Sequence, residues 1–332
     1  MRDICARLGQ ARAQRGLETP ELVQEEAGIH LGIASDLEQA ASHAAEVFAE
    51  RYQCWLERDR LAAWGQYKRH HFTVAVGGGN TVKAQYRALL QRYTTSIDWI
   101  RHVRFFLLEE STGEPNWESV KQGLELNFIV PLAQKLIRSR GEGAVARALG
   151  IEAHISEETI IQRMLEQMVH PIQLAECRQA LEAGQRALAG RLARREADRY
   201  QREIVTRLGQ SMEFHHLVSG IGKDGTLGAF SPYTPELAQR EPGAVVLKQG
   251  RDALRVALNR GVLTGAENIS LIVSGSLKLK ALGRFEMEES ADFEQTVMET
   301  PLRMLRETRE IAEKVYIFAD EGALHFDETV LE

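Results

Sequence analysis

Two glycine-rich stretches carry the residues best suited to chemistry in this sequence. The first, Phe72-Thr-Val-Ala-Val-Gly-Gly-Gly-Asn-Thr81, is an apolar run that leads into a glycine loop, and residues 82–92 have the pattern of a helix. The backbone N–H groups of such a loop, a threonine hydroxyl and the positive end of the next helix can together hold an oxyanion. The loop lacks the Gly-Lys-Ser/Thr ending of a P-loop and the spacing of a dinucleotide-binding loop. The predicted phosphate-binding residues are Gly77, Gly78, Gly79, Asn80 and Thr81.

The second stretch is Val218-Ser-Gly-Ile-Gly-Lys-Asp-Gly-Thr-Leu-Gly-Ala-Phe230, which follows a short apolar run. Its glycines allow a sharp turn at a strand end and a close approach of the backbone to a ligand. In an open parallel sheet, ligands bind beyond the carboxyl ends of the strands, so this turn would deliver Asp224 to a site. We expect Gly222 to contact the ligand and Asp224 to be a catalytic carboxylate. The alternative is an Asp-Gly turn without chemistry.

A third candidate is the acidic pair Glu109-Glu110, which closes the apolar run 103–108. Carboxylates at a strand end can face a cleft, where loss of solvent or a neighbouring like charge raises one pKa toward that of a working base. The alternative is a pair of solvated acids at the entrance to a loop. We take both residues as catalytic candidates.

The strands that carry these residues are uniformly apolar, which predicts burial on both faces. The runs 73–76, 103–108 and 271–273 have this pattern, and they alternate with helical segments such as 36–61. Strands buried on both faces are typical of parallel sheets covered by helices. We predict a three-layer, Rossmann-like, doubly wound α/β fold with a mostly parallel sheet.

The two loops, in this order, resemble those of the glucosamine-6-phosphate isomerase/deaminase and 6-phosphogluconolactonase family. The resemblance continues in Val103-Arg-Phe-Phe-Leu-Leu-Glu-Glu110, in Arg255-Val-Ala-Leu-Asn259 and in Leu271-Ile-Val-Ser-Gly-Ser-Leu-Lys278. It extends from about residue 36 to residue 326. It implies that Arg255 and Lys278 add positive charge to the phosphate site; Lys280, two residues on, is the competing lysine.

This sequence departs from the family pattern at three positions, one of which is Ser231 in place of a later glutamate of the deaminases. Thr226 stands where the family has a histidine after Asp-Gly, and a threonine does not titrate near neutral pH. Glu109 stands where the deaminases have an aspartate that takes a substrate proton. The histidines His215 and His216 precede the turn, and we expect both to be core residues of a strand.

The resemblance implies a phosphorylated sugar as ligand and an enzyme that hydrolyses a sugar-phosphate lactone, as 6-phosphogluconolactonase does. One alternative is aldose-ketose isomerisation or deamination of an amino-sugar phosphate, with Glu109 as base. The other is a binding or regulatory protein without catalysis. No cofactor motif and no set of metal ligands with workable spacing occurs.

We predict an N-terminal helical extension over residues 1–34, with a helix start at Thr19-Pro20, and an α/β domain over 35–332 with a helical insertion at about 135–200. Further helices are expected over 116–132, ending near Pro131, over 174–200 and over 300–314. The basic run 186–195 is flanked by acids, so a solvated helix face is expected. The alternatives are binding of a partner or a nucleic acid, or an apolar side that forms a lid or a contact to a second copy of the chain.

The overall composition limits the partners. A net charge of -6 gives no reason to expect nucleic acid or an anionic membrane. Three widely spaced cysteines argue against a disulfide framework, and no apolar run approaches the length of a membrane span. We expect a cytoplasmic protein.

Overall fold

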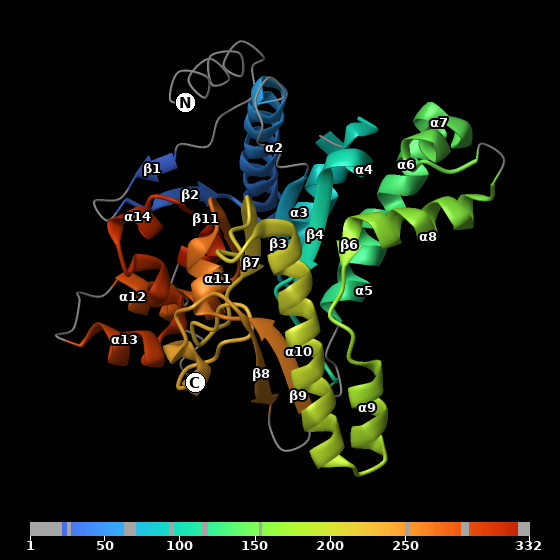
Figure 1. The fold of residues 1–332 in the computed structure, drawn as a ribbon. Coiled ribbons are helices and arrows are strands. Elements are labelled where there is room, and N and C mark those ends of the chain that lie inside the picture. The colour runs from blue at the N-terminus through green and yellow to red at the C-terminus, as the bar shows by residue number, and fades with distance from the viewer. Residues whose placement is uncertain are drawn as a thin grey trace.

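The structure is a computed structural model. It describes residues 22–24, 28–62, 71–92, 96–113, 119–152, 155–249, 253–286 and 292–324. It confirms the predicted α/β class, with a mostly parallel sheet between layers of helices (Figure 1). None of the helices in these ranges is long and apolar enough to cross a lipid bilayer.

The main sheet has eight strands in the order β1-β2-β11-β10-β7-β3-β4-β6, and only the β1–β2 pair is antiparallel. The three predicted apolar runs form central strands, and every residue of those strands is buried. The strands are β1 (Leu22–Gln24), β2 (His30–Ala34), β3 (Phe72–Val76), β4 (Val103–Leu107), β6 (Val169–His170), β7 (His216–Gly220), β10 (Ile269–Val273) and β11 (Val315–Asp320).

The winding of the chain reverses between β3 and β7, which are neighbours in the sheet. From β3 the chain continues to β4 on one side, whereas from β7 it continues to β10 on the other side. Right-handed crossovers in opposite directions place helices on opposite faces and leave a crevice at the carboxyl ends of the two strands. Both glycine-rich stretches follow these two strands.

Helices α2 (Leu37–Ala62) and α3 (Asn80–Arg92) pack against each other on one face. Phe48 of α2 contacts Phe72 and His216 of the sheet in edge-to-face geometry. The segments that lead to β10 and β11 are α11 (Arg260–Gly265), η3 (Ser276–Lys278), α12 (Leu279–Glu286), α13 (Phe293–Glu299), η4 (Pro301–Arg306) and α14 (Arg309–Ala312).

A second, antiparallel sheet adjoins the carboxyl edge of the first. It consists of β5 (Glu109–Ser111), β9 (Ala253–Leu258) and β8 (Ala244–Gln249), with β9 in the middle. One residue separates β4 from β5. Glu109 therefore lies where the chain leaves the main sheet and enters the small one.

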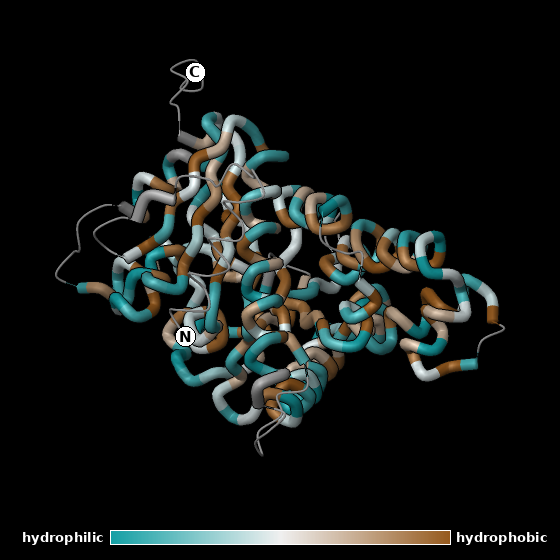
Figure 2. Tube along the Cα trace, turned by 90° about the horizontal axis from the view of Figure 1, so that it is seen from above, coloured by the Kyte–Doolittle hydropathy of each residue, from teal (hydrophilic) through white to brown (hydrophobic). Residues whose placement is uncertain are grey.

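Residues 120–208 are mainly helical, and α6 to α8 extend to one side beyond β6 (Figure 1). Seen from above, hydrophobic residues alternate with hydrophilic ones along these helices (Figure 2), as expected of amphipathic packing. The elements are α5 (Val120–Leu124), the π-helical turn η1 (Glu125–Ile129), α6 (Val130–Arg140), α7 (Glu142–Ala148), α8 (Glu157–Met168), α9 (Ala175–Glu182) and α10 (Arg186–Leu208).

Several predicted helix ends differ in the structure. The chain stays helical through Pro131 to Arg140: the π-helical turn runs directly into α6, and the proline stands in the first turn of that helix. Residues 174–200 form two helices instead of one, since Gly184 adopts a φ of 73° between them.

The two ends of the chain also differ from expectation. In place of a helix over 300–314 there are η4 and α14, because Thr308 caps a new helix by accepting from the Ile311 N–H. Residues 22–24 and 30–34 of the predicted helical extension are strands. The predicted helix start at Thr19-Pro20 lies outside the described residues.

Candidate functional site

A cavity of about 2170 Å³ lies at the carboxyl ends of β3 and β7. Most of its described lining comes from four places: the loop after β3, the turn after β7, the small sheet and helix α10; Leu37, Leu181 and the segment 233–239 also contribute. Lys278 of η3 and Ser274, just after β10, complete it on the far side of the turn. This is the location that the topology of a doubly wound sheet favours.

The glycine loop after β3 presents its second half to this cavity. Gly78, Gly79, Asn80 and Thr81 line it, and α3 begins at Asn80. The first N–H groups of a helix have no acceptor within the helix, so this end of α3 can donate to an anion. Gly79 has a φ of 102°, a conformation that favours glycine.

Gly77 has a different role from the one predicted. Its N–H donates to the Val218 carbonyl at 2.8 Å. A Cβ at this position would lie 3.0 Å from the Ser219 Oγ. Gly77 therefore lets β3 and β7 approach closely, and its N–H is not free to bind a ligand.

The turn after β7 packs directly against the glycine loop. A Cβ on Gly220 would lie 2.6 Å from the Thr81 Oγ1, and a Cβ on Gly222 would lie 2.6 Å from the Asp224 Oδ1. Both positions thus require glycine. Gly222 lines the cavity, but its N–H donates within the turn to the Thr226 carbonyl at 2.7 Å. The two predicted motifs form one continuous wall.

Asp224 lines the cavity at the tip of this turn and is held by Thr226. Both the hydroxyl and the N–H of Thr226 donate to its Oδ1, at 2.7 and 3.1 Å. Partial burial raises the pKa of Asp224, but the Thr226 hydrogen bonds, with a smaller effect from Lys278, outweigh it and leave the pKa below its usual value. Asp224 is therefore an oriented anion rather than a proton donor.

Lys278 lies on the same side, with its Nζ donating to the Ile221 carbonyl at 2.6 Å. Burial lowers the pKa of Lys278, and the negative charge of Asp224 opposes this change. Lys278 lines the cavity, whereas Lys280 is exposed and is not among its lining residues. The structure thus separates the two lysines between which the sequence left a choice.

Glu109 and Arg255 both line the cavity, but they are bonded to each other. The Arg255 Nη1 donates to the Glu109 Oε2 at 2.7 Å, with side chains 8% and 7% exposed. Burial raises the pKa of Glu109; Arg255 offsets part of this rise, and Glu110 adds to it. A predicted base and a predicted phosphate ligand are thus partners of one another.

Glu110 lies elsewhere, against the start of α5. Its carboxylate accepts from the Ser119 hydroxyl at 2.7 Å and from the Lys121 N–H at 3.1 Å. It is buried and is not among the described residues that line the cavity. Its contacts are those of a helix-capping residue, in contrast to the catalytic role expected.

The two histidines before the turn are part of the sheet. His215 contacts the Thr73 Oγ1 through its Nδ1 at 2.8 Å, and His216 contacts the Ser270 Oγ through its Nε2 at 3.0 Å. Both are buried. The described lining of the cavity includes no histidine and no cysteine, so neither of these residue types replaces the family histidine at Thr226 within it.

Helix α10 forms the wall opposite the glycine loop, which the sequence did not predict. Arg186, Arg191 and Arg194 line the cavity together with the small residues Ala187 and Gly190. Their spacing places them on one side of the helix. The signal was present as the basic run 186–195, for which a solvated face was expected.

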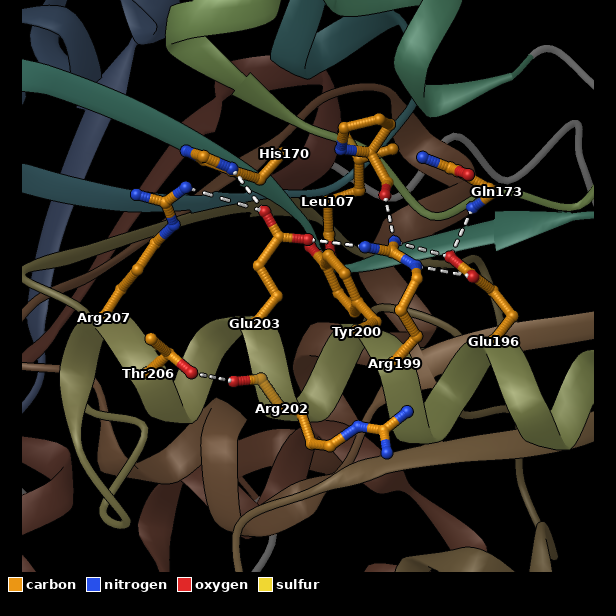
Figure 3. A network of polar contacts seen from close by, with 11 residues as sticks. Leu107, His170, Gln173, Glu196, Arg199, Tyr200, Arg202, Glu203, Thr206 and Arg207 are labelled. Carbon is orange, nitrogen blue, oxygen red and sulfur yellow. Dashed lines mark hydrogen bonds and ion pairs between the residues drawn. The ribbon is translucent and has the colours of Figure 1, made fainter.

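The other side of α10 is fixed to the sheet by a polar network (Figure 3). Arg199 donates to Glu196 and Glu203, each at 2.7 Å, and to the Pro171 carbonyl at 2.9 Å. The Tyr200 hydroxyl donates to the Leu107 carbonyl at the end of β4, at 2.8 Å. The cavity-facing arginines therefore project from an anchored helix.

No group of three or more histidine, cysteine, aspartate or glutamate side chains in the described part of the chain could hold a metal ion.

Comparisons with known proteins agree with this geometry. Residues 151–315 match the model of the family described as glucosamine-6-phosphate isomerases/6-phosphogluconolactonase. A search of curated protein sequences found no match. The resemblance predicted from the sequence is thus confirmed by the family model and by solved structures of similar fold.

Three of these structures illustrate the likeness. A 6-phosphogluconolactonase from Trypanosoma brucei is 14% identical, with a TM-score of 0.56 over 88% of this chain and 96% of that one. The enzyme from Trypanosoma cruzi is 15% identical, with a TM-score of 0.55 over 88% and 94%. A monomeric glucosamine-6-phosphate deaminase is 16% identical, with a TM-score of 0.54 over 89% and 99%. At these identities the likeness establishes the fold.

Proposed function

We propose that this chain binds a phosphorylated sugar in the cavity between β3, β7 and α10. Its residues 151–315 match the model of the glucosamine-6-phosphate isomerase and 6-phosphogluconolactonase family. The observation that carries the proposal is the junction of the glycine loop with the turn after β7. There, Gly78, Gly79 and the N-terminus of α3 face the same cavity as Lys278. Backbone N–H groups and a lysine are a recurrent combination for holding phosphate.

The reaction that we propose is hydrolysis of a sugar-phosphate lactone. Asp224 would orient the attacking water, because it is anionic, fixed by Thr226 and lines the cavity. Glu109 is the second carboxylate in the cavity, and Arg255 holds its orientation. Opening a lactone requires attack of water on an activated carbonyl carbon, a step that an oriented carboxylate can assist.

Isomerisation or deamination of an amino-sugar phosphate fits the site less well. Those reactions remove a proton from carbon, and the predicted base is Glu109. Here the Glu109 carboxylate is buried and already bonded to Arg255. A base committed to a buried ion pair is poorly placed to accept a substrate proton.

A second candidate function is binding without turnover. One observation favours it: Thr226 occupies the position after Asp224-Gly225 and donates twice to the Asp224 carboxylate. The polar contacts of Asp224 are thereby partly satisfied inside the turn. A protein of this kind would retain the phosphate site and respond to a sugar phosphate as a signal.

A binding experiment on four proteins tests the proposal. Thermal unfolding of the wild type, Lys278→Ala, Lys280→Ala and Asp224→Asn is measured with 6-phosphogluconate and with glucosamine 6-phosphate. A ligand at a hundred times its Kd stabilises the folded state by about 2.7 kcal/mol. We expect stabilisation in the wild type and in the exposed-lysine control Lys280→Ala, and a loss of it in Lys278→Ala.

Turnover of the lactone then separates the two candidate functions. Hydrolysis by the wild type that is lost in Asp224→Asn, with binding retained, supports the hydrolase. If the wild type binds the sugar phosphate but hydrolyses the lactone no faster than the spontaneous reaction, the result supports binding without turnover. The absence of stabilisation by either sugar phosphate would overturn the proposed ligand class.

A further inference from the structure

The cavity is larger and more cationic than one sugar phosphate requires. Its volume of about 2170 Å³ exceeds the range of roughly 300–1,000 Å³ that is usual for small-molecule sites. Among the described residues, seven basic and four acidic side chains line it, although the chain as a whole has a net charge of -6. The surplus of positive charge is therefore local to the cavity.

Much of this charge lies on α10, across the cavity from the phosphate loop. Arg191 and Arg194 are exposed, line the cavity and have no hydrogen-bond or ion-pair partner within the described ranges. Other arginines of the same helix are paired, such as Arg195 with Glu176 at 2.8 Å and Arg199 with Glu196 at 2.7 Å. Arg191 and Arg194, which face the cavity, thus differ from these paired arginines in having guanidinium groups available to a ligand.

The backbone between these arginines also faces open space. Gly190 lines the cavity, and a Cβ built on it would meet no atom within 4 Å. A glycine inside a helix costs about 1 kcal/mol relative to alanine, and packing in the free protein does not demand one here. A small residue at this point leaves room for a ligand group beside the two guanidinium planes.

The helix holds these groups in place. Glu196, Arg199, Tyr200 and Glu203 lie on the side of α10 opposite Arg191 and Arg194, as the 3.6-residue period requires. They connect it to β4 and to the segment after β6 (Figure 3). The backbone that carries Arg191 and Arg194 is therefore already fixed before an anion binds to their guanidinium groups.

We propose that Arg191 and Arg194 form a second anion subsite, and that the ligand is a sugar carrying two phosphoryl groups. One phosphoryl group binds at Gly78–Thr81 and Lys278, and the other binds at α10. This inference rests on the proposed function, because it assigns the substrate class of the same cavity. Paired guanidinium groups recognise the planar edges of phosphate and carboxylate oxygens.

Calorimetric titration with matched ligands tests the subsite. Fructose 1,6-bisphosphate and fructose 6-phosphate differ by the second phosphoryl group, and 6-phosphogluconate and glucose 6-phosphate differ in having or lacking a carboxylate. The proteins are the wild type, Arg191→Gln/Arg194→Gln, and the control Arg195→Gln/Arg202→Gln. The control removes the same charge from the same helix, at positions that do not line the cavity.

We expect the wild type and the control to bind the bisphosphate about tenfold more tightly than the monophosphate. The Arg191→Gln/Arg194→Gln variant should lose this preference and keep its affinity for fructose 6-phosphate. A preference for 6-phosphogluconate over glucose 6-phosphate that exceeds the bisphosphate preference would make the second group a carboxylate and overturn the bisphosphate assignment.

Three other results would overturn the inference. If the wild type binds the two fructose phosphates with equal affinity, there is no second anion subsite, and the proposed function is unaffected. An equal loss of preference in the control assigns the effect to general surface charge. If no sugar phosphate binds, the proposed function fails as well.

Discussion

Asp224 and Glu109 lie in the same cavity, but their surroundings shift their pKa values in opposite directions. Two hydrogen bonds from Thr226 keep Asp224 ionised, and burial favours the neutral form of Glu109. Divergent pKa values in one site are the usual basis for dividing roles between two carboxyl groups. The residue that activates water can therefore be identified by titration.

The pH profile of lactone hydrolysis is the first prediction. If Asp224 orients the water, kcat/KM stays level as the pH falls and declines only below about 3.8, the ordinary value for an aspartate. If Glu109 performs this step, the decline begins above its ordinary value of 4.5. A decline near pH 6.5 contradicts the assignment to Asp224, whose pKa lies below 3.8.

Glu109→Gln is the second prediction at this scale. Because the pKa of Glu109 is raised in the folded state, its favourable contribution is complete below its unfolded pKa and is lost as the pH rises through its folded pKa. Glutamine has the same shape without the titration. We expect the variant to match the wild type at pH 4 and to be the more stable protein at pH 8.

Urea unfolding of both proteins across this range provides the measurement. Should the wild type gain stability over Glu109→Gln as the pH rises, the attraction of Arg255 outweighs burial, and the pKa of Glu109 is lowered rather than raised.

Strand β7 carries the turn with Asp224, and its other residues adapt it to the centre of the sheet. Burial lowers the pKa of His216 to about 3 from 6.5, so the ring is neutral in the folded protein. A depressed histidine pKa stabilises the folded state above the unfolded pKa, and this stability is lost as the pH falls. Mild acid should therefore weaken β7 and, with it, the site.

The prediction concerns His216→Gln, which keeps a polar group near Ser270 without a proton to gain. The wild type should lose stability relative to the variant by up to about 1.4 kcal/mol for each pH unit below 6.5. Unfolding free energies at pH 7, 6 and 5 measure the difference. A constant difference over this range would show that His216 is not the source of acid sensitivity.

Helix α10 is the element that gives the cavity its far wall, and Arg199 is the centre of its attachment. Arg199→Gln removes bonds to Glu196, Glu203 and the Pro171 carbonyl. Because Arg199 is about one-third exposed, we expect a modest loss of roughly 1–2 kcal/mol. Hydrogen exchange should rise in α10 and stay unchanged in β3 and β10, whereas a uniform rise would contradict a local anchoring role.

At the scale of the whole molecule, the sequence predicted what depends on short-range patterns. The glycine loop at 77–81, the turn around Asp224 and the apolar strands are each readable within about ten residues, and the sheet brings them together as expected. Family resemblance pointed to Lys278, which lines the cavity.

What the sequence did not predict depends on contacts between distant segments. The pairing of Glu109 with Arg255 joins residues 146 positions apart. The contacts of Glu110 with Ser119 and Lys121 at the start of α5 join residues nine and eleven positions apart. The role of the basic run on α10 depends on the opposite face of that helix, where Arg199 and Tyr200 attach it to the sheet.

The central claim is that the cavity recognises a phosphorylated sugar through its phosphoryl group. The most direct measurement compares the affinity of the wild type for 6-phosphogluconate and for gluconate, which differ in the phosphoryl group alone, by titration calorimetry. We predict binding of 6-phosphogluconate and at least about tenfold weaker binding of gluconate. Equal affinity for the two acids, or no binding of 6-phosphogluconate, would contradict the account.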